Sequence, residues 1–168
     1  MKTRIFTGLL LFYSIGAATA DDDEFARRSL GGLRGFEVLI EKLRPEVERT
    51  GLTTEVVRTD VELRLRQSGI LVLSHKMALQ EPGTPELYVN VNVTTGDSRL
   101  WGYGIGLELN QYVSLERDPA IQIMATTWSI HTGGGAANPS QIGESVRGSV
   151  RSLIDRFMNS YLSVNPRK

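Results

Sequence analysis

The chain has 168 residues, with 19 Lys and Arg balanced by 19 Asp and Glu, and it contains no cysteine. Because the net charge is zero, nothing draws the chain to nucleic acid or to an anionic membrane, and we expect no nucleic-acid partner. The lack of cysteine excludes disulfides, thiol nucleophiles and thiolate metal sites, and in an exported protein of this size it favours a bacterial source.

The amino terminus predicts export. Lys2 and Arg4 precede an apolar stretch over residues 5–15, and Ala18 and Ala20 are the small residues of a cleavage site, the order found in secretory signal peptides. An uncleaved membrane anchor is the alternative, but about 11 apolar residues are too few to cross a ~30 Å hydrocarbon core. We therefore expect residues 1–20 to be a signal peptide. The mature protein would be periplasmic or secreted, without stable membrane insertion.

After the expected cut, residues 21–32 are acidic, then basic, then glycine-containing. This composition predicts a flexible tether, because little in it can offset the cost of ordering a backbone. Its acidic start lacks the glycine and the spacing of a calcium loop. Residues 33–168 are expected to form a single domain. The domain opens with an apolar strand over residues 36–43, which Pro45 ends.

Residues 53–67 carry two conflicting patterns. Apolar and polar residues alternate over residues 61–66 as in a strand, whereas Thr53 or Thr54 could cap a helix that Gly69 would end. The end signals favour a helix. A short strand over residues 70–74 follows it, and a strand–helix–strand order with short connections predicts a parallel pair with the first strand.

Three more strands are predicted over residues 87–94, 101–115 and 121–130, each from a period-two pattern. A turn at residues 117–119 would pair position 116 with position 120, which brings the apolar faces of the last two strands together.

A long closing helix is predicted from Asn138, as its cap, to Asn165, with Pro139 in the first turn. Apolar residues recur along it at helical spacing: Ile142, Val146, Val150, Leu153, Ile154, Phe157, Met158, Tyr161 and Leu162. The fold expected is a two-layer α+β sandwich in the order β-α-β-β-β-β-α. It would have a mostly antiparallel sheet and two helices on one face.

Two sets of glycines call for an interpretation. The run at residues 133–135 lies before the closing helix, but without a Gly-Lys-Ser/Thr sequence it is better read as a flexible connection than as a phosphate loop. Gly102, Gly104 and Gly106 clear one face of a strand. The space could be filled by Trp128 from the neighbouring strand, which we favour, or it could be a platform for a ligand.

Catalysis has little support in the sequence. His75 and His131 each follow a strand, and Ser74, Ser129 and Asp155 could complete a triad on paper, but no serine lies in a Gly-x-Ser-x-Gly elbow. We therefore assign no catalytic residue, no metal site and no cofactor. A small periplasmic hydrolase with an unrecognised site is the alternative.

If odd positions of the last three strands face the core, an amide-rich face with aromatics and few charges results. It would hold Tyr88, Asn90, Asn92, Glu108, Asn110, Tyr112, Gln122, Met124 and Trp128. Such a face suits a glycan or an extended chain of an envelope protein, although an ordinary solvated face has the same pattern. The candidate binding residues are Tyr88, Asn90, Asn92, Glu108, Asn110 and Trp128.

Four segments carry a resemblance: residues 51–53 with 59–66, then 87–92, 125–129 and 157–166. Together they are similar to a family of small exported bacterial proteins with no assigned activity, which implies an envelope protein and transfers no site residue. The order of elements also resembles small periplasmic α+β domains of envelope assembly proteins, such as the amino-terminal domain of the Tol-system propeller protein. The function expected is a non-catalytic binding or interaction domain of the envelope.

Overall fold

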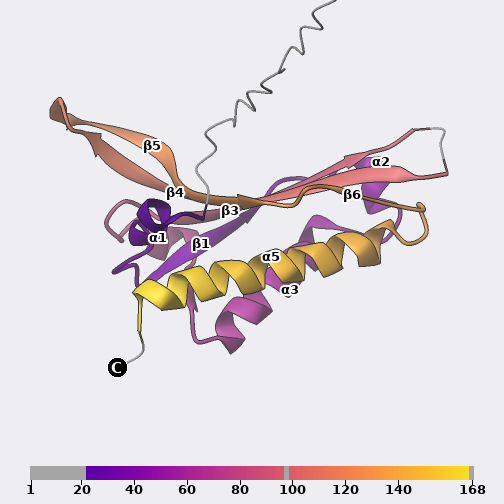
Figure 1. Ribbon diagram of the computed structural model, residues 1–168, viewed down its shortest axis with the longest axis horizontal. Helices are drawn as coiled ribbons and strands as arrows, with labels where there is room; N and C mark the ends of the chain where they lie inside the picture. Colours follow the sequence, from indigo (N-terminus) through magenta and orange to yellow (C-terminus); the bar gives the residue numbers. More distant parts are fainter. Residues whose placement is uncertain (1–21, 97–98, 167–168) are drawn as a thin grey trace, which may run out of the picture.

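The structure is a computed structural model that describes residues 22–96 and 99–166, so the expected signal peptide lies outside the described residues. Helices and strands occur in similar proportion, as expected for an α+β protein (Figure 1). In chain order the elements are α1 (Glu24–Arg28), β1 (Gly35–Ile40), α2 (Pro45–Glu48), α3 (Thr54–Gln67), β2 (Leu71–Val72), α4 (His75–Ala78), β3 (Glu86–Thr94), β4 (Trp101–Leu115), β5 (Asp118–His131), β6 (Gly135–Ala137) and α5 (Ile142–Val164).

The described strands form one sheet in the order β2-β1-β3-β4-β5, and β6 pairs with β4 beyond the end of β5. The parallel pair of β1 and β2 is confirmed by the register of Gly35 with Leu71. However, β1 is also parallel to β3, so the sheet is mixed rather than mostly antiparallel. The reason is that residues 73–85 return the chain to the end of the sheet where β1 begins, and the backbone N–H of Glu37 donates to the carbonyl of Pro85.

Helix α3 resolves the ambiguity of residues 53–67 as predicted. The Thr53 hydroxyl accepts from the Val56 N–H at 3.2 Å, a standard N-cap bond, and Gly69 takes a positive φ of 76° just after the helix. Val61 and Leu65 are fully buried, whereas Leu63 between them is half exposed. The side chains therefore follow the helical period, and the local alternation misleads.

Helix α5 lies beside α3 on the same side of the sheet (Figure 1). Its apolar stripe is buried as predicted, but the helix begins at Ile142 rather than near Asn138, and Gln141 precedes it without a side-chain cap bond. Two forked ion pairs join the helices, Arg147 with Asp60 and Arg64 with Asp155, each with contacts as short as 2.6 Å. Asp60 precedes Arg64 in α3, and their partners Arg147 and Asp155 follow in the same order in α5. The two helices therefore run parallel.

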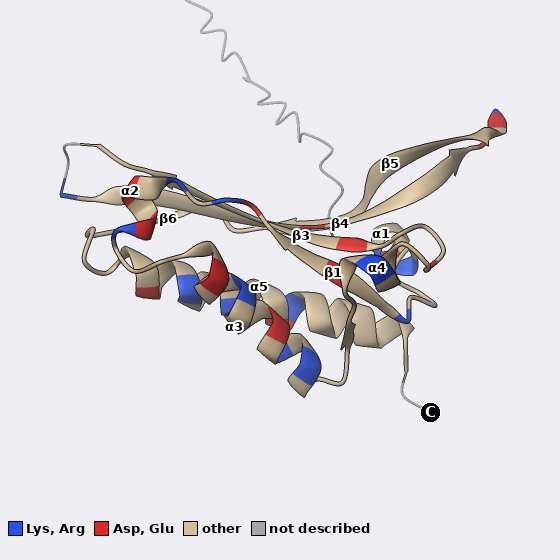
Figure 2. Cartoon of the chain, turned by 180° about the vertical axis from the view of Figure 1, so that it is seen from behind, with Lys and Arg blue, Asp and Glu red and all other residues tan. Residues whose placement is uncertain are grey.

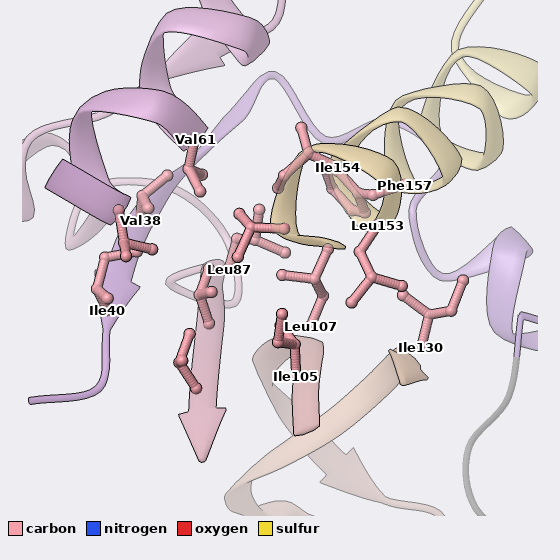
Figure 3. Packing of buried hydrophobic residues seen from close by; sticks show 14 of the residues in the cluster. Val38, Ile40, Val61, Leu87, Ile105, Leu107, Ile130, Leu153, Ile154 and Phe157 are labelled. Carbon is pink, nitrogen blue, oxygen red and sulfur yellow. The ribbon is translucent and has the colours of Figure 1, made fainter. Parts of the chain in front are cut away.

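The core lies between the sheet and these two helices (Figure 3). Aliphatic residues of β1, β3 and β4 meet α3 and α5 in its middle, while aromatic rings fill one end. Phe157 is fully buried there, with its ring 5.0 Å from that of Trp128 and 5.3 Å from that of Phe36, both in edge-on contacts. Such pairs add to the stabilisation that buried area alone supplies.

Residues 22–32 are not the tether that their composition predicts. They form α1 and pack on the domain, with Leu30 fully buried. Asp22 accepts hydrogen bonds from the Trp128 indole N–H at 2.9 Å and from the Ser160 hydroxyl at 2.7 Å, and it pairs with Arg27. The Asp22 carboxylate keeps this segment on the domain because it accepts hydrogen bonds from buried donors. These donors are far away in sequence, so the composition of residues 21–32 does not reveal them.

The pairing of β4 with β5 is irregular at two points that the sequence pattern does not indicate. At the tip Leu115 pairs with Asp118, so the predicted turn at residues 117–119, which would pair position 116 with position 120, is wrong. From Ser114 with Gln122 to Asn110 with Thr126, the strands do have the predicted register. The register then shifts, because Thr127 is an extra residue on β5, and Leu109 pairs with Trp128. A bulge of this kind bends a strand and increases its twist. Beyond it the hairpin projects past α1 and curves away from the helices (Figure 1).

Candidate functional site

The sheet face opposite α3 and α5 is called here the open face, because neither long helix covers it (Figures 1 and 2). Strand pairing places five of the six predicted binding residues on it: Tyr88, Asn90, Asn92, Glu108 and Asn110. Tyr88 lies opposite Glu108, and Asn92 lies opposite Gly104. Asn92 is exposed, whereas the other four are half buried.

Trp128, the sixth predicted residue, does not belong to this face. The extra residue at Thr127 reverses the alternation of β5, so the Trp128 side chain points into the core and is fully buried. The expectation that its ring covers the strand glycines is therefore wrong as well. Its indole N–H is bonded to Asp22 inside the domain.

A chain of hydrogen bonds links the amides of the open face. Asn92 donates to the Asn90 side-chain oxygen at 2.6 Å, and Asn90 in turn donates to the Glu41 carboxylate. Burial raises the pKa of the Tyr88 hydroxyl, and the neighbouring Glu41 and Glu108 carboxylates raise it further. Tyr88 therefore stays protonated at neutral pH and remains a hydrogen-bond donor beside these acceptors.

Glu108 is the centre of a second group. Its carboxylate lies 3.5 Å from the Thr126 hydroxyl and 3.6 Å from Nε2 of His131. Gly106 allows the His131 ring to lie this close to Glu108, because a Cβ at position 106 would meet the ring at 2.7 Å. The imidazole, not Trp128, is the group that lies over this glycine.

The other two strand glycines face open space. A Cβ added at Gly102 or Gly104 would meet no atom within 4 Å, and the same holds at Gly133 in the loop after β5. Ala136 of β6 pairs with Gly102 and adds only a methyl group. These residues, Gly102, Gly104, Gly133 and Ala136, form a patch of nearly bare backbone that we call the glycine shelf. The run at residues 133–135 thus leads into β6 and borders the shelf, rather than leading directly to a helix.

The charged residues of the described strands are all acidic. None of the described strands contains Lys or Arg, whereas Glu37, Glu86 and Glu108 alternate onto the open face. The basic residues lie mainly on helices and loops (Figure 2). Glu37, Leu39 and Glu41 were missed as members of this face because the neighbour of the first strand was unknown. The period-two pattern of residues 36–41 was the available signal.

The histidines do not build a catalytic arrangement that we can recognise. Nδ1 of His75 lies 2.9 Å from Glu37, and both His131 and the Thr126 hydroxyl approach the Glu108 carboxylate. In a catalytic triad the histidine lies between the nucleophilic hydroxyl and the carboxylate. Here the Glu108 carboxylate lies between the Thr126 hydroxyl and His131, so the arrangement is not that of a triad. Of the other residues considered for a triad, Ser74 caps α4, Ser129 is buried and Asp155 pairs with Arg64.

Cavities lie elsewhere on the molecule. One of about 300 Å³ lies beside the first turns of α5 and is lined by Thr50, Ser140, Glu144, Arg147 and Arg151 among others. Another of about 500 Å³ lies around Arg34 and Glu81. Neither is lined by a histidine. Within residues 22–96 and 99–166, no group of three or more His, Asp or Glu is placed to hold a metal. None of the helices in the described part of the chain is long and apolar enough to cross a membrane.

No protein-family model matches the chain, and a search of curated proteins finds no relative. Function is therefore inferred from the geometry of the open face.

Proposed function

We propose that this protein is a non-catalytic binding domain of the bacterial envelope, and that a glycan chain binds across its open face. The observation that carries the proposal is the glycine shelf. Gly102 and Gly104 keep a patch of backbone bare directly beside the amides of β3. Glycine weakens a strand interior, so bare backbone is best explained by something that must approach it closely.

Charge narrows the class of ligand. The described strands carry carboxylates and no Lys or Arg, so a phosphate-rich or sulfated ligand would be repelled. Sugar hydroxyls can both donate and accept, which matches a surface where Asn92 offers the amide N–H that is not bonded to Asn90 and Glu108 accepts. A flat sugar ring also fits a shelf without side chains better than it fits a deep pocket.

The envelope location rests on the amino-terminal sequence, with its basic start, apolar stretch and Ala18–Ala20 cleavage site. An exported domain meets surface and periplasmic polysaccharides directly. The same location makes nucleotide ligands unsuitable for the glycine-rich segments.

Gly104→Leu is the sharpest variant for the test, because the new side chain enters open space and a β-strand tolerates Leu better than Gly. The fold should be unaffected while the shelf is blocked. Ser152→Leu, on the exposed surface of α5, is the matched control. Asn90 is a poorer choice, since it donates to Glu41 and its replacement would disturb the face itself.

The exported protein would be applied to an array of bacterial envelope glycans, including peptidoglycan and exopolysaccharide fragments. We expect wild type and Ser152→Leu to bind a shared subset, with Gly104→Leu weaker by about tenfold or more, the equivalent of one or two lost hydrogen bonds. Absence of glycan binding by the wild type, or equal binding by Gly104→Leu, would overturn the proposal. Capture of an extended polypeptide at the shelf instead would assign the face to a protein partner.

A further inference from the structure

The outer part of the β4–β5 hairpin, residues 111–125, is called here the arm. Its side chains are unusually apolar for an exposed segment: Tyr112, Ile121, Ile123 and Met124 are each between 42% and 48% exposed. Charged residues occur only at its tip, at Glu116, Arg117 and Asp118, and Figure 2 shows the rest of the arm without charge. Clustered apolar exposure of this kind marks an interaction surface.

The arm also has a free strand edge, that of β5. Strand β5 is the last of its sheet, and in the described part of the chain no backbone hydrogen bond joins its outer edge to another segment between Ala120 and Thr126. On the β4 side, the Tyr112 N–H donates to the Gly83 carbonyl. A two-stranded ribbon with a free edge is marginal in water and readily pairs with another strand.

One side of the arm continues the core-facing side of the sheet. Val113 and Ile123 share that side, because they pair with each other in the hairpin. The last element to cover it is α1, where the Ser29 hydroxyl donates to the Thr127 carbonyl at 3.1 Å. From Thr127 toward the tip of the arm, no helix in the described part of the chain covers the apolar side of the sheet, as Figure 1 shows.

We propose that a second copy of this chain occupies the arm, with the outer edges of the two β5 strands paired antiparallel about a two-fold axis at Gln122. In this register Ile121 of each copy lies opposite Ile123 of the other, and β-branched cross-strand pairs stabilise a sheet. Pairing a strand with itself antiparallel is the simplest closed arrangement for identical subunits.

Charge complementarity supports a second copy as the occupant. The antiparallel pairing brings the tip of one arm, with Glu116, Arg117 and Asp118, to the base of the other. Helix α1 lies next to the base of the arm, where the Ser29 hydroxyl bonds to Thr127, and it carries Arg27 and Arg28. The Arg28 ion pair with Glu24 is exposed and therefore weak. Arg28 is therefore available to Glu116 or Asp118 of the incoming tip, and Glu24 is available to its Arg117. The uncharged middle of the arm meets its own copy without repulsion.

The oligomeric state of the exported protein gives the first test. Light scattering after size exclusion should report a dimer at micromolar concentration. Ile123→Lys should shift the protein to monomer, since it sets a charge into the apolar pairing. Leu63→Lys makes the same kind of change at an exposed residue of α3 and should remain a dimer. A monomeric wild type, or an Ile123→Lys variant that stays dimeric, would contradict the proposal.

The register has its own test, made simple by the absence of cysteine from the chain. Gln122→Cys places one thiol against its own copy at a cross-strand distance that a disulfide can bridge. Ser114→Cys, the β4 neighbour of Gln122, is the matched control, because it lies a strand further from the axis. Mild oxidation should cross-link Gln122→Cys into a covalent dimer much faster than Ser114→Cys. Equal rates would rule out pairing through the β5 edges.

Discussion

Replacing Asp22 by Ala should destabilise the domain strongly, although the residue lies at the start of the described chain. The Asp22 carboxylate accepts from Trp128, whose side chain is fully buried, and from Ser160, which is 5% exposed. Each buried donor left without an acceptor costs about 1–3 kcal/mol. With the ion pair to Arg27 also lost, we expect a loss of about 2–5 kcal/mol in the free energy of unfolding, a large part of a typical domain's stability.

The effect should depend on pH in a definite direction. Burial alone would raise the pKa of Asp22, but hydrogen bonds from Arg27, Ser160 and Trp128 outweigh it and hold the pKa below its ordinary value. A carboxyl group with a lowered pKa in the folded state contributes stability above the pKa of the unfolded chain, about 3.9. The difference between wild type and Asp22→Ala should therefore be complete at neutral pH and shrink as the pH falls below about 4.

Urea denaturation followed by tryptophan fluorescence measures both quantities. Asp23→Ala is the control: that neighbouring residue caps only the short, exposed α1, so its loss should cost about 1 kcal/mol or less. If Asp22→Ala changes the free energy of unfolding by less than about 0.5 kcal/mol, residues 22–32 are not anchored to the core and the packing of α1 is wrong.

Three further expectations can be checked separately. Phe157→Ala should lower the free energy of unfolding, measured by thermal unfolding, by about 3–5 kcal/mol because the ring is fully buried. The control Arg156→Ala, on the exposed side of α5, should change it little. A small effect of Phe157→Ala would mean that α5 does not cover the sheet. Thr53→Ala should cost about 1 kcal/mol by removing the cap of α3, and an unchanged unfolding midpoint would count against that bond. Expression in a Gram-negative host should yield a periplasmic protein that begins at Asp21, and an intact mass that includes the leader would refute export with cleavage.

Local signals predicted much of this fold. The Thr53 cap, the glycine after α3 and the stripe of α5 depend on residues close together in sequence, and the structure confirms each. The register of residues 110–114 with 122–126 also agrees with the prediction, although the turn itself does not, since Leu115 pairs with Asp118.

Features set by distant residues were not predictable. Nothing near Asp22 in sequence indicates that it will bind Trp128, 106 positions away. The bulge at Thr127 has no sequence signature here, yet it alone moves Trp128 from the open face to the core. The contribution of Glu37 and Glu41 to the open face required knowing that β1 pairs with β3. Five of the six candidate site residues share a face because period-two alternation holds wherever no bulge intervenes.

The most direct test of the open face as a glycan-binding surface is an NMR titration of the isotope-labelled exported protein with the tightest-binding glycan from the array. We expect the largest amide shifts on the glycine shelf and its border, at Asn92, Gly102, Gly104 and Gly133. Shifts concentrated instead on α3, α5 or the arm would contradict glycan binding at the open face.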